Sequence, residues 1–267
     1  MNPWFVVLFL IFLGLCFGSF VNALVWRLHQ GRDWVKERSE CPHCHHILAA
    51  KDLVPVFSWL YLHGKCRYCH KPIPDSPIVE LLLPLLFVIS YVCWPQPLYG
   101  FGLFAFGLWL IFLVGFLTLA LYDLKWFLLP DVVVFPLVGL AVIQVLARTF
   151  IFDGGWHSLV SAALGAAIIS GLFCAIYVVS KGTWIGFGDV KLGVVLGLLA
   201  GGVLPALLVL FVASVLGTLI ALPLVLLKKA DRKSHLPFGP LLIVGTVVVV
   251  LFGQIIIDWY SSLLYAM

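Results

Sequence analysis

Long apolar runs follow one another along the chain, with short polar breaks between them. A hydrocarbon core about 30 Å thick requires roughly 20 apolar residues in one helix, and the runs have that length. The stretch 190–227 is too long for a single span, and we divide it at Gly201-Gly202 and Pro205, where a tight turn can form. Without that division there would be seven spans. The pattern therefore predicts an all-α polytopic membrane protein with about eight transmembrane helices, near residues 4–26, 78–95, 98–122, 132–150, 157–180, 190–202, 204–227 and 239–265.

Composition supports this interpretation. The chain has 267 residues, is 63% hydrophobic, and carries only 16 basic and 12 acidic side chains. Soluble domains are roughly 45–50% apolar and about 25% charged, so a soluble globular enzyme is excluded. The first apolar segment has no basic residue before it, and we expect an uncleaved span rather than a signal peptide. Its Gly14, Gly18, Ser19 and Asn22 form a small and polar stripe, which favours close helix packing.

The basic residues indicate an orientation. Fifteen of the sixteen fall in odd-numbered loops, counted by the preceding span, and Arg148 alone falls on the other side. Cytoplasmic loops retain lysine and arginine, so we expect both termini outside and every odd loop in the cytoplasm.

The first loop, residues 27–76, is a candidate zinc module. It contains Cys41-Pro-His-Cys44 and, after 21 intervening residues, Cys66-Arg-Tyr-Cys69. Two Cys-x-x-Cys turns can place four thiolates around one tetrahedral ion, and the metal would supply folding energy to a small loop. Disulfides are the alternative, but they are rare in the cytoplasm. We expect three parts: 1–26 as the first helix, 27–76 as a cytoplasmic tetracysteine zinc loop, and 77–267 as a helical core.

Four acidic residues lie at the boundaries of the predicted spans: Glu80, Asp123, Asp131 and Asp189. A carboxylate is costly there and is a functional candidate by default. The topology places the three aspartates at cytoplasmic helix ends, so they share one membrane depth. Two aspartates a few ångströms apart share a proton and can act as acid and base around one water.

Glycines precede Asp189. Without Cβ atoms, Gly186 and Gly188 would let an extended backbone approach the carboxylate, and they accept dihedrals that other residues do not. The alternatives are structural: Asp131 and Asp189 are suited to helix N-caps, and Lys125 or Lys191 could form ion pairs with the acids. The residues alone leave these alternatives open.

Taken together, the motifs resemble the type IV prepilin peptidase family, the bifunctional leader peptidases and N-methyltransferases of pilus, type II secretion and competence systems. The resemblance covers nearly the whole chain in order and spacing. Its motifs are Gly18-Ser19-Phe20-Val21-Asn22, Arg27-Leu28, the two Cys-x-x-Cys pairs, Pro77-Ile78-Val79-Glu80-Leu81, Asp123, Leu129-Pro130-Asp131, Gly186-Phe187-Gly188-Asp189-Val190-Lys191-Leu192 and Pro237-Phe238-Gly239-Pro240.

The resemblance implies a Gly-x-Gly-Asp intramembrane aspartyl protease of the bacterial inner membrane. Its substrates would be type IV prepilins or pseudopilins beside the lipid bilayer, with S-adenosylmethionine as methyl donor, zinc in the loop and no nucleic-acid partner. Glu80 would partner a basic group. The implied site residues are Asp123 and Asp189 as catalysts, Gly186, Gly188, Asp131 and Lys191 in support, Gly64 and Lys65 in methyl transfer, and Cys41, Cys44, Cys66 and Cys69 on the metal.

Two other functions compete with this one. A peptidase without methylation is suggested by departures around residues 71–77 and by a short segment before Cys41. A proton-coupled transporter would use the same acids as a relay, but it predicts acids spread across membrane depth and inverted repeats, and neither is evident.

Overall fold

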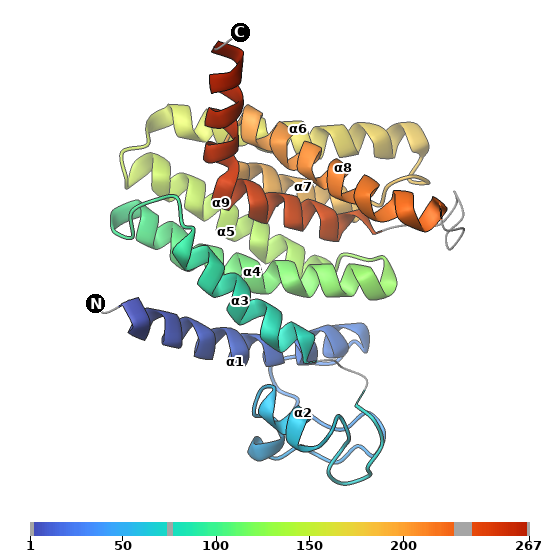
Figure 1. The fold of residues 1–267 in the computed structure, drawn as a ribbon. Helices are drawn as coiled ribbons and strands as arrows, with labels where there is room; N and C mark the ends of the chain where they lie inside the picture. The colour runs from blue at the N-terminus through green and yellow to red at the C-terminus, as the bar shows by residue number, and fades with distance from the viewer. Residues whose placement is uncertain (1–2, 74–76, 227–236, 266–267) are drawn as a thin grey trace. The chain divides into compact units, whose positions relative to one another are not determined.

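The structure is a computed structural model that describes residues 3–73, 77–226 and 237–265, and this part of the chain is helical (Figure 1). The eight long helices correspond one by one to the predicted apolar segments. The cysteine loop adds two short elements, η1 (Ala50–Asp52) and α2 (Phe57–Tyr61). The long helices are α1 (Pro3–His29), α3 (Ile78–Val92), α4 (Gly100–Trp126), α5 (Asp131–Phe150), α6 (Gly155–Ser180), α7 (Phe187–Ala200), α8 (Val203–Leu226) and α9 (Phe238–Tyr265).

Six of these helices are long and apolar enough to cross a membrane. The other two, α3 with 15 residues and α7 with 14, are shorter. At 1.5 Å per residue, α7 is about 21 Å long, less than the hydrocarbon core. The fold class is confirmed, while the number of eight spans stays a prediction.

The chain divides into two compact units. The first comprises Met1–Val92 and Leu110–Thr118, and the second comprises Cys93–Trp109 and Leu119–Met267. Helix α4 therefore contributes its middle to the first unit and its two ends to the second. The three predicted parts, with boundaries after residues 26 and 76, stay a prediction.

In the first unit, α1 and α3 pack along each other. A Cβ atom added to Gly14 would lie 2.4 Å from Pro84 Cα, and one added to Gly18 would lie 2.6 Å from Glu80 Cα. Both distances are far below van der Waals contact, so only glycine allows the two backbones to come so close. The glycines of the predicted stripe therefore pack helix against helix, as expected.

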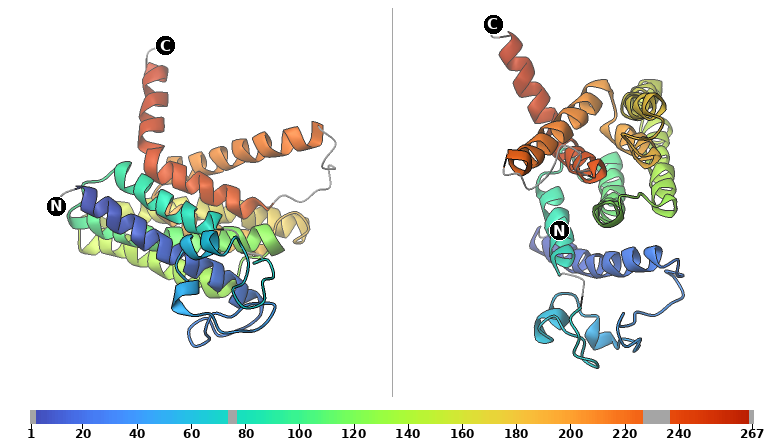
Figure 2. Two further views of the ribbon diagram at one scale, coloured as in Figure 1. Left: turned by 60° about the horizontal axis from the view of Figure 1, so that its bottom comes forward. Right: turned by 90° about the vertical axis from the view of Figure 1, so that its right-hand side faces the viewer.

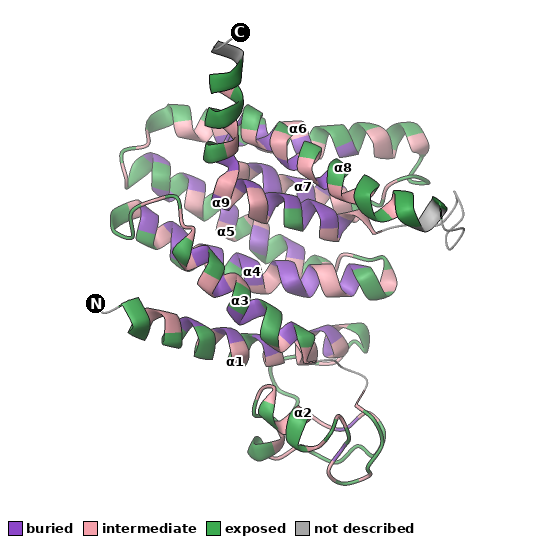
Figure 3. Ribbon diagram, viewed as in Figure 1, coloured by how far each residue is buried: buried purple, intermediate pink, exposed green. Residues whose placement is uncertain are grey.

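In the second unit, α7 packs against α5, α6, α8 and α9. Figures 1 and 2 show α6 and α7 side by side, and α7 is among the most buried helices in Figure 3. A Cβ on Gly197 would lie 2.4 Å from Ala166 Cα, so these helices also touch through glycine. Because neighbouring helices cover α7, most of its apolar side chains face protein, and Phe187 at its start is the exposed one.

The division between α7 and α8 is confirmed. Gly201 caps α7 in the left-handed conformation, with φ of 72°. Its N–H donates to the Gly197 carbonyl, and α8 begins two residues later. The two glycines and Pro205 thus mark a tight turn inside one long apolar run, which explains why that run forms two helices.

The glycine contact between α1 and α3 can be tested by a single substitution. We expect Gly14→Leu to force the helices apart, because its Cβ would meet the backbone of Pro84. Overpacking of this kind costs about 1–3 kcal/mol or more. The measurement is the thermal unfolding midpoint of the purified protein in detergent. Cys16→Leu, at an exposed position of the same helix, is the control, and equal midpoints for the two variants would contradict the packing argument.

Candidate active site and metal centre

Three helix ends of the second unit bring two aspartates to one point. Asp123 lies in the last turn of α4, Asp189 in the first turn of α7, and Gly239 is the second residue of α9. A Cβ atom on Gly239 would lie 2.7 Å from Asp123 Oδ2 and 3.7 Å from Asp189 Oδ1. The two carboxylate oxygens are therefore no farther apart than the sum of these distances. The predicted convergence of the two acids is present in the structure.

The two carboxylates have few polar groups in contact with them. Asp123 is 6% exposed and Asp189 is half-buried. The backbone of Gly239 hydrogen-bonds to the Asp123 carboxylate. Neither carboxylate forms an ion pair within residues 3–73, 77–226 and 237–265, so the expected alternative of a salt bridge to Lys125 or Lys191 is wrong for both.

The capping alternative is also wrong for Asp189. Helix α7 has Gly186 as its N-cap, with Asp189 three residues further on, and it has no side-chain capping bond. Likewise, α5 has Pro130 as its N-cap and Asp131 as its first residue. The Asp189 carboxylate is directed to Gly239 and Asp123 rather than to the end of its own helix.

The two glycines before Asp189 differ in their surroundings. A Cβ on Gly188 would lie 3.0 Å from the Leu129 Cβ, so this glycine allows α7 to pack against the α4–α5 connection. A Cβ on Gly186 would meet only the Gly188 nitrogen, at 3.9 Å, so the space beside it is open. Neither glycine has a positive φ, and the expectation of unusual dihedrals at these positions is therefore wrong. Open space beside Gly186 remains available to an approaching backbone.

Asp131 forms an ion pair of its own and does not belong to the pair of Asp123 and Asp189, which we call the dyad. Its carboxylate accepts a hydrogen bond from the Lys191 ammonium, which also lies 5.5 Å from the Phe135 ring and 5.4 Å from the Phe187 ring. The pair joins the first residue of α5 to the fifth residue of α7. Lys191 is two residues beyond Asp189, so this contact helps to position the turn that carries Asp189.

Gly239 is the residue whose role the sequence left unassigned. The only signal was the Pro237-Phe238-Gly239-Pro240 motif, which carries no ionisable group. In the structure its bare α-carbon makes room for both carboxylates, since a Cβ would collide with Asp123.

The four cysteines of the loop form a site of the right size for zinc. Their sulfur atoms all lie within 4.8 Å of one another, and Cys41 Sγ lies 3.8 Å from Cys69 Sγ. A regular tetrahedron with Zn–S bonds of about 2.3 Å has edges of about 3.8 Å. The predicted metal ligands are therefore brought together, and their arrangement fits a closed tetrahedral zinc site.

The two Cys-x-x-Cys turns have the same backbone structure. In each, the N–H of the first cysteine bonds to the carbonyl five residues on, and its carbonyl accepts from the residue four positions on. That residue, His45 or His70, has φ of 57° in both turns. His46 instead contacts the ring of Tyr68, with centroids 3.6 Å apart and the ring planes tilted by 36°. These histidines shape the loop around a site that four thiolates already complete.

Three other predicted residues lie in this loop or beside it. Gly64 has φ of 70° and packs on the Trp59 ring, and Lys65 pairs with Pro72 in an antiparallel bridge. Glu80 Oε2 accepts a hydrogen bond of 2.6 Å from the Val56 N–H. The expected basic partner of Glu80 is therefore replaced by a backbone donor of the loop.

Comparison with known proteins decides the family. Residues 12–94 match the bacterial peptidase A24 N-terminal domain, and residues 110–222 match the type IV leader peptidase family. The chain belongs to the type IV leader peptidase family. A prepilin leader peptidase/N-methyltransferase of Aeromonas hydrophila is 31% identical over 97% of this chain and 95% of its own length. Proteins of the same name from Stutzerimonas stutzeri (95% of this chain, 93% of that protein) and Pseudomonas aeruginosa (97% and 94%) are each 32% identical.

No solved structure matches the chain significantly. The resemblance inferred from the motifs is confirmed by these relatives, whose similarity extends over nearly the whole of this chain. Family membership and the six long apolar helices make the chain a multi-pass enzyme of the inner membrane.

Replacing two of the cysteines tests the metal centre. We expect the purified leader peptidase to hold about one zinc ion per chain, and Cys41→Ser with Cys44→Ser to lose it, because serine does not supply a thiolate. Metal content is measured by mass spectrometry of the digested protein. Cys93→Ser with Cys174→Ser, outside the cluster, is the matched control and should keep the zinc. Full zinc content after loss of Cys41 and Cys44 would contradict the assignment.

Proposed function

We propose that this protein is a bifunctional prepilin leader peptidase. It cleaves the basic leader from type IV prepilins or pseudopilins, and it then methylates the new N-terminus with S-adenosylmethionine. The proposal rests chiefly on the two carboxylates of Asp123 and Asp189, which face one point beside Gly239, in a chain of the leader peptidase family.

The orientation follows from the basic residues. Both termini lie outside, and the cysteine loop and the aspartates lie at the cytoplasmic face, because fifteen of sixteen basic side chains belong to that side. Four of them, at positions 228, 229, 232 and 233, lie outside the described residues. A prepilin with a basic leader in the cytoplasm and a hydrophobic helix in the bilayer would then present its scissile bond at the depth of the aspartates.

Hydrolysis at this site needs one proton between the two carboxylates. Like charges this close do not both ionise at low cost, so one aspartate is ionised and the other protonated. The ionised carboxylate removes a proton from a water molecule as its oxygen attacks the scissile carbonyl carbon. The protonated one donates its proton to the carbonyl oxygen, which gives a neutral tetrahedral intermediate.

The intermediate collapses in the second step. The carbon–nitrogen bond breaks, and the leaving nitrogen takes the proton that the first aspartate had removed from water. The second aspartate recovers its proton from the hydroxyl group as the carboxylic acid of the leader forms. The products are the leader and a pilin with a free amino group, and the dyad returns to its starting state.

Methyl transfer uses that amino group. Its unprotonated nitrogen attacks the methyl carbon of the sulfonium, the carbon–sulfur bond breaks, and sulfur keeps the electron pair as S-adenosylhomocysteine forms. The methylated amine releases one proton to solvent. We assign this step to the side of the protein that holds the cysteine loop, with Gly64 and Lys65 as supporting residues. The zinc ion would hold the fold of that loop.

The dyad is tested by removing one carboxylate at a time. Asp123→Asn and Asp189→Asn should each reduce prepilin cleavage by at least about 1,000-fold, because neither the acid nor the base acts alone. The measurement is the mass of a co-expressed prepilin. Asp153→Asn, at an exposed residue of the α5–α6 connection, is the control and should cleave normally. Normal processing by either dyad variant would rule out this mechanism.

The two activities should separate in the cysteine variants. With wild-type enzyme, we expect the pilin to lose its leader and gain the mass of one methyl group. Cys41→Ser with Cys44→Ser should retain much of the cleavage but lose the methyl group, because the loop loses its metal while the aspartates belong to the other unit. Full methylation by the zinc-free variant would sink the assignment of methyl transfer to the loop.

A further inference from the structure

A cavity open on one side lies in the first unit, where α1 ends, α3 begins and the cysteine loop folds back on both. The space in it that the centre of a water-sized molecule can occupy is about 170 Å³. It shares no lining residue with the aspartate site of the second unit. Its walls include Ser19, Asn22, Ala23 and Trp26 of α1, Glu40, Cys41, Asp52, Trp59, Cys66 and Arg67 of the loop, and Glu80 of α3.

We propose that this cavity binds the methyl donor, S-adenosylmethionine. The inference rests on the proposed methyl transfer and names the site where the donor is held. A nucleoside sulfonium needs flat apolar surface for its base, acceptors for its ribose hydroxyls and ammonium, and an environment that tolerates a cation. The open side meets another requirement, because the donor's methyl group must stay accessible to the amino group of the pilin.

Aromatic rings supply the flat surface. Trp26 of α1 and Trp59 of the loop line the cavity. Indole faces attract cations as well as planar rings, so they suit both the sulfonium and the adenine. The Trp59 Nε1 is buried and has no hydrogen-bond partner within the described residues. This N–H has no accessible surface that a ligand could reach, so Trp59 contributes its ring face to the cavity.

Gly64 sets the place of that ring. A Cβ atom on Gly64 would lie 3.0 Å from Trp59 Cζ2 and 3.6 Å from its Nε1, so the indole rests on the bare backbone. Because Gly64 also has φ of 70°, a side chain there would be strained and would displace the ring. The glycine therefore acts on the cavity through Trp59, as a positioning residue.

Glu80 is the carboxylate best placed to receive the donor. Arg67 bonds to Asp52 at 2.6 Å and Arg32 bonds to Glu40 at 2.5 Å, so those two acids already have charged partners. Glu80 binds the Val56 N–H through Oε2, and its Oε1 has no partner in the described part of the chain. This second oxygen can accept a hydrogen bond from a ribose hydroxyl or the ammonium of the donor.

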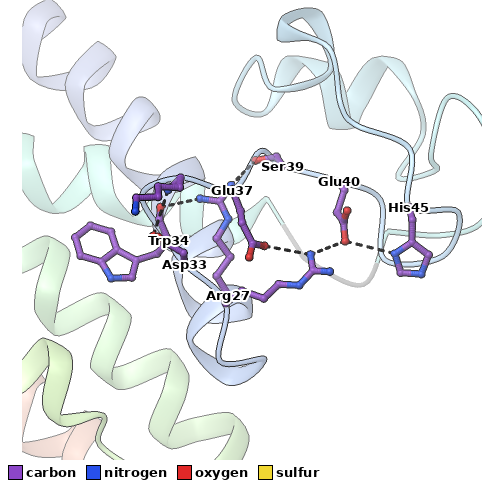
Figure 4. Close-up of polar contacts among 9 residues, drawn as sticks. Arg27, Asp33, Trp34, Glu37, Ser39, Glu40 and His45 are labelled. Atoms are coloured by element: carbon purple, nitrogen blue, oxygen red, sulfur yellow. Dashed lines mark hydrogen bonds and ion pairs between the residues drawn. The ribbon is translucent and has the colours of Figure 1, made fainter.

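The walls are tied to one another by the same contacts that fold the loop. The Arg27 guanidinium, buried at the end of α1, donates to the Trp34 carbonyl and to Ser39 Oγ, each at 3.1 Å (Figure 4). Cys41 and Cys66, one from each metal-binding turn, form part of the lining. A zinc ion on these sulfurs would thus hold one wall of the cavity, which gives a physical reason for the metal to matter to methyl transfer.

Filling the cavity from α1 tests the inference. Ala23 lines the cavity and belongs neither to the cysteine cluster nor to the aspartate pair, so Ala23→Phe should occupy the donor's space while leaving the residues of both sites in place. Cys16→Phe, at an exposed position two turns earlier on α1, is the control of similar added size. Binding of S-adenosylmethionine and of S-adenosylhomocysteine to the full-length protein in detergent is measured by isothermal titration calorimetry. Zinc content and prepilin cleavage report whether each variant is folded.

We expect Ala23→Phe to weaken binding of both nucleosides at least tenfold, with zinc and cleavage unchanged, and Cys16→Phe to bind as the wild type does. A second variant, Asn22→Leu, removes a polar wall group at nearly constant volume and should also weaken binding. Ultraviolet cross-linking of labelled S-adenosylmethionine to the wild type should mark the peptide that carries Trp26 or Trp59.

Two results would overturn the inference in different ways. Wild-type binding by both cavity variants, or a cross-link confined to the second unit, would place the donor elsewhere and leave the proposed bifunctional activity standing. A wild type that binds neither nucleoside and releases cleaved, unmethylated pilin would refute the proposed methyl transfer together with the cavity.

Discussion

The close approach of two carboxylates at a helix boundary is the constraint on which this structure depends. A charged carboxylate is costly to bury inside a protein, and two of them together are costlier unless they share a proton. The second unit accommodates both by bringing helix ends together at Gly239, where the absence of a Cβ leaves room beside Asp123. Asp131 and Lys191 neutralise each other next to this point, so their charges do not compete for the dyad.

The same constraint explains the unusual α7. It has 14 residues, it packs against four other helices, and its first five residues include both Asp189 and Lys191. Glycine contacts such as Gly197 against Ala166 draw its neighbours close enough to cover it. A short, covered helix can hold its polar N-terminal turn inside the protein, which a lipid-facing helix of this length could not do at low cost.

The first unit depends on other constraints, because it contains the cysteine loop. A loop of about fifty residues with few large apolar side chains does not hold a fold by burial alone. Four thiolates at zinc-site spacing, the Arg27 contacts to the loop and the Val56–Glu80 hydrogen bond supply the missing constraints. The cavity at this junction is a consequence of tying a polar loop to the ends of two packed helices.

Much of this could be predicted from the sequence, because the strongest signals are local. Apolar length predicted the eight helices, Gly201 and Pro205 predicted the break before α8, and paired Cys-x-x-Cys turns predicted the cluster of four sulfurs. What depends on three-dimensional approach could not be predicted. Examples are the role of Gly239 beside the aspartates, the packing of the Trp59 ring on Gly64, and the hydrogen bond from the Val56 backbone to Glu80. These contacts involve residues that are far apart in the chain or that have no ionisable group. The short segment 190–202 was predicted, but its cover by neighbouring helices was not, since apolarity does not distinguish a covered helix from a lipid-facing one.

The most direct test of the central claim is the binding of a prepilin peptide whose scissile amide is replaced by a hydroxyl-bearing tetrahedral carbon. If Asp123 and Asp189 act together on one tetrahedral centre, the wild-type enzyme should bind it at least about 100-fold tighter than a matched peptide with a plain methylene. Asp123→Asn and Asp189→Asn should each abolish that difference. Equal affinity of the wild type for the two peptides, or a preference that survives in either variant, would contradict the account.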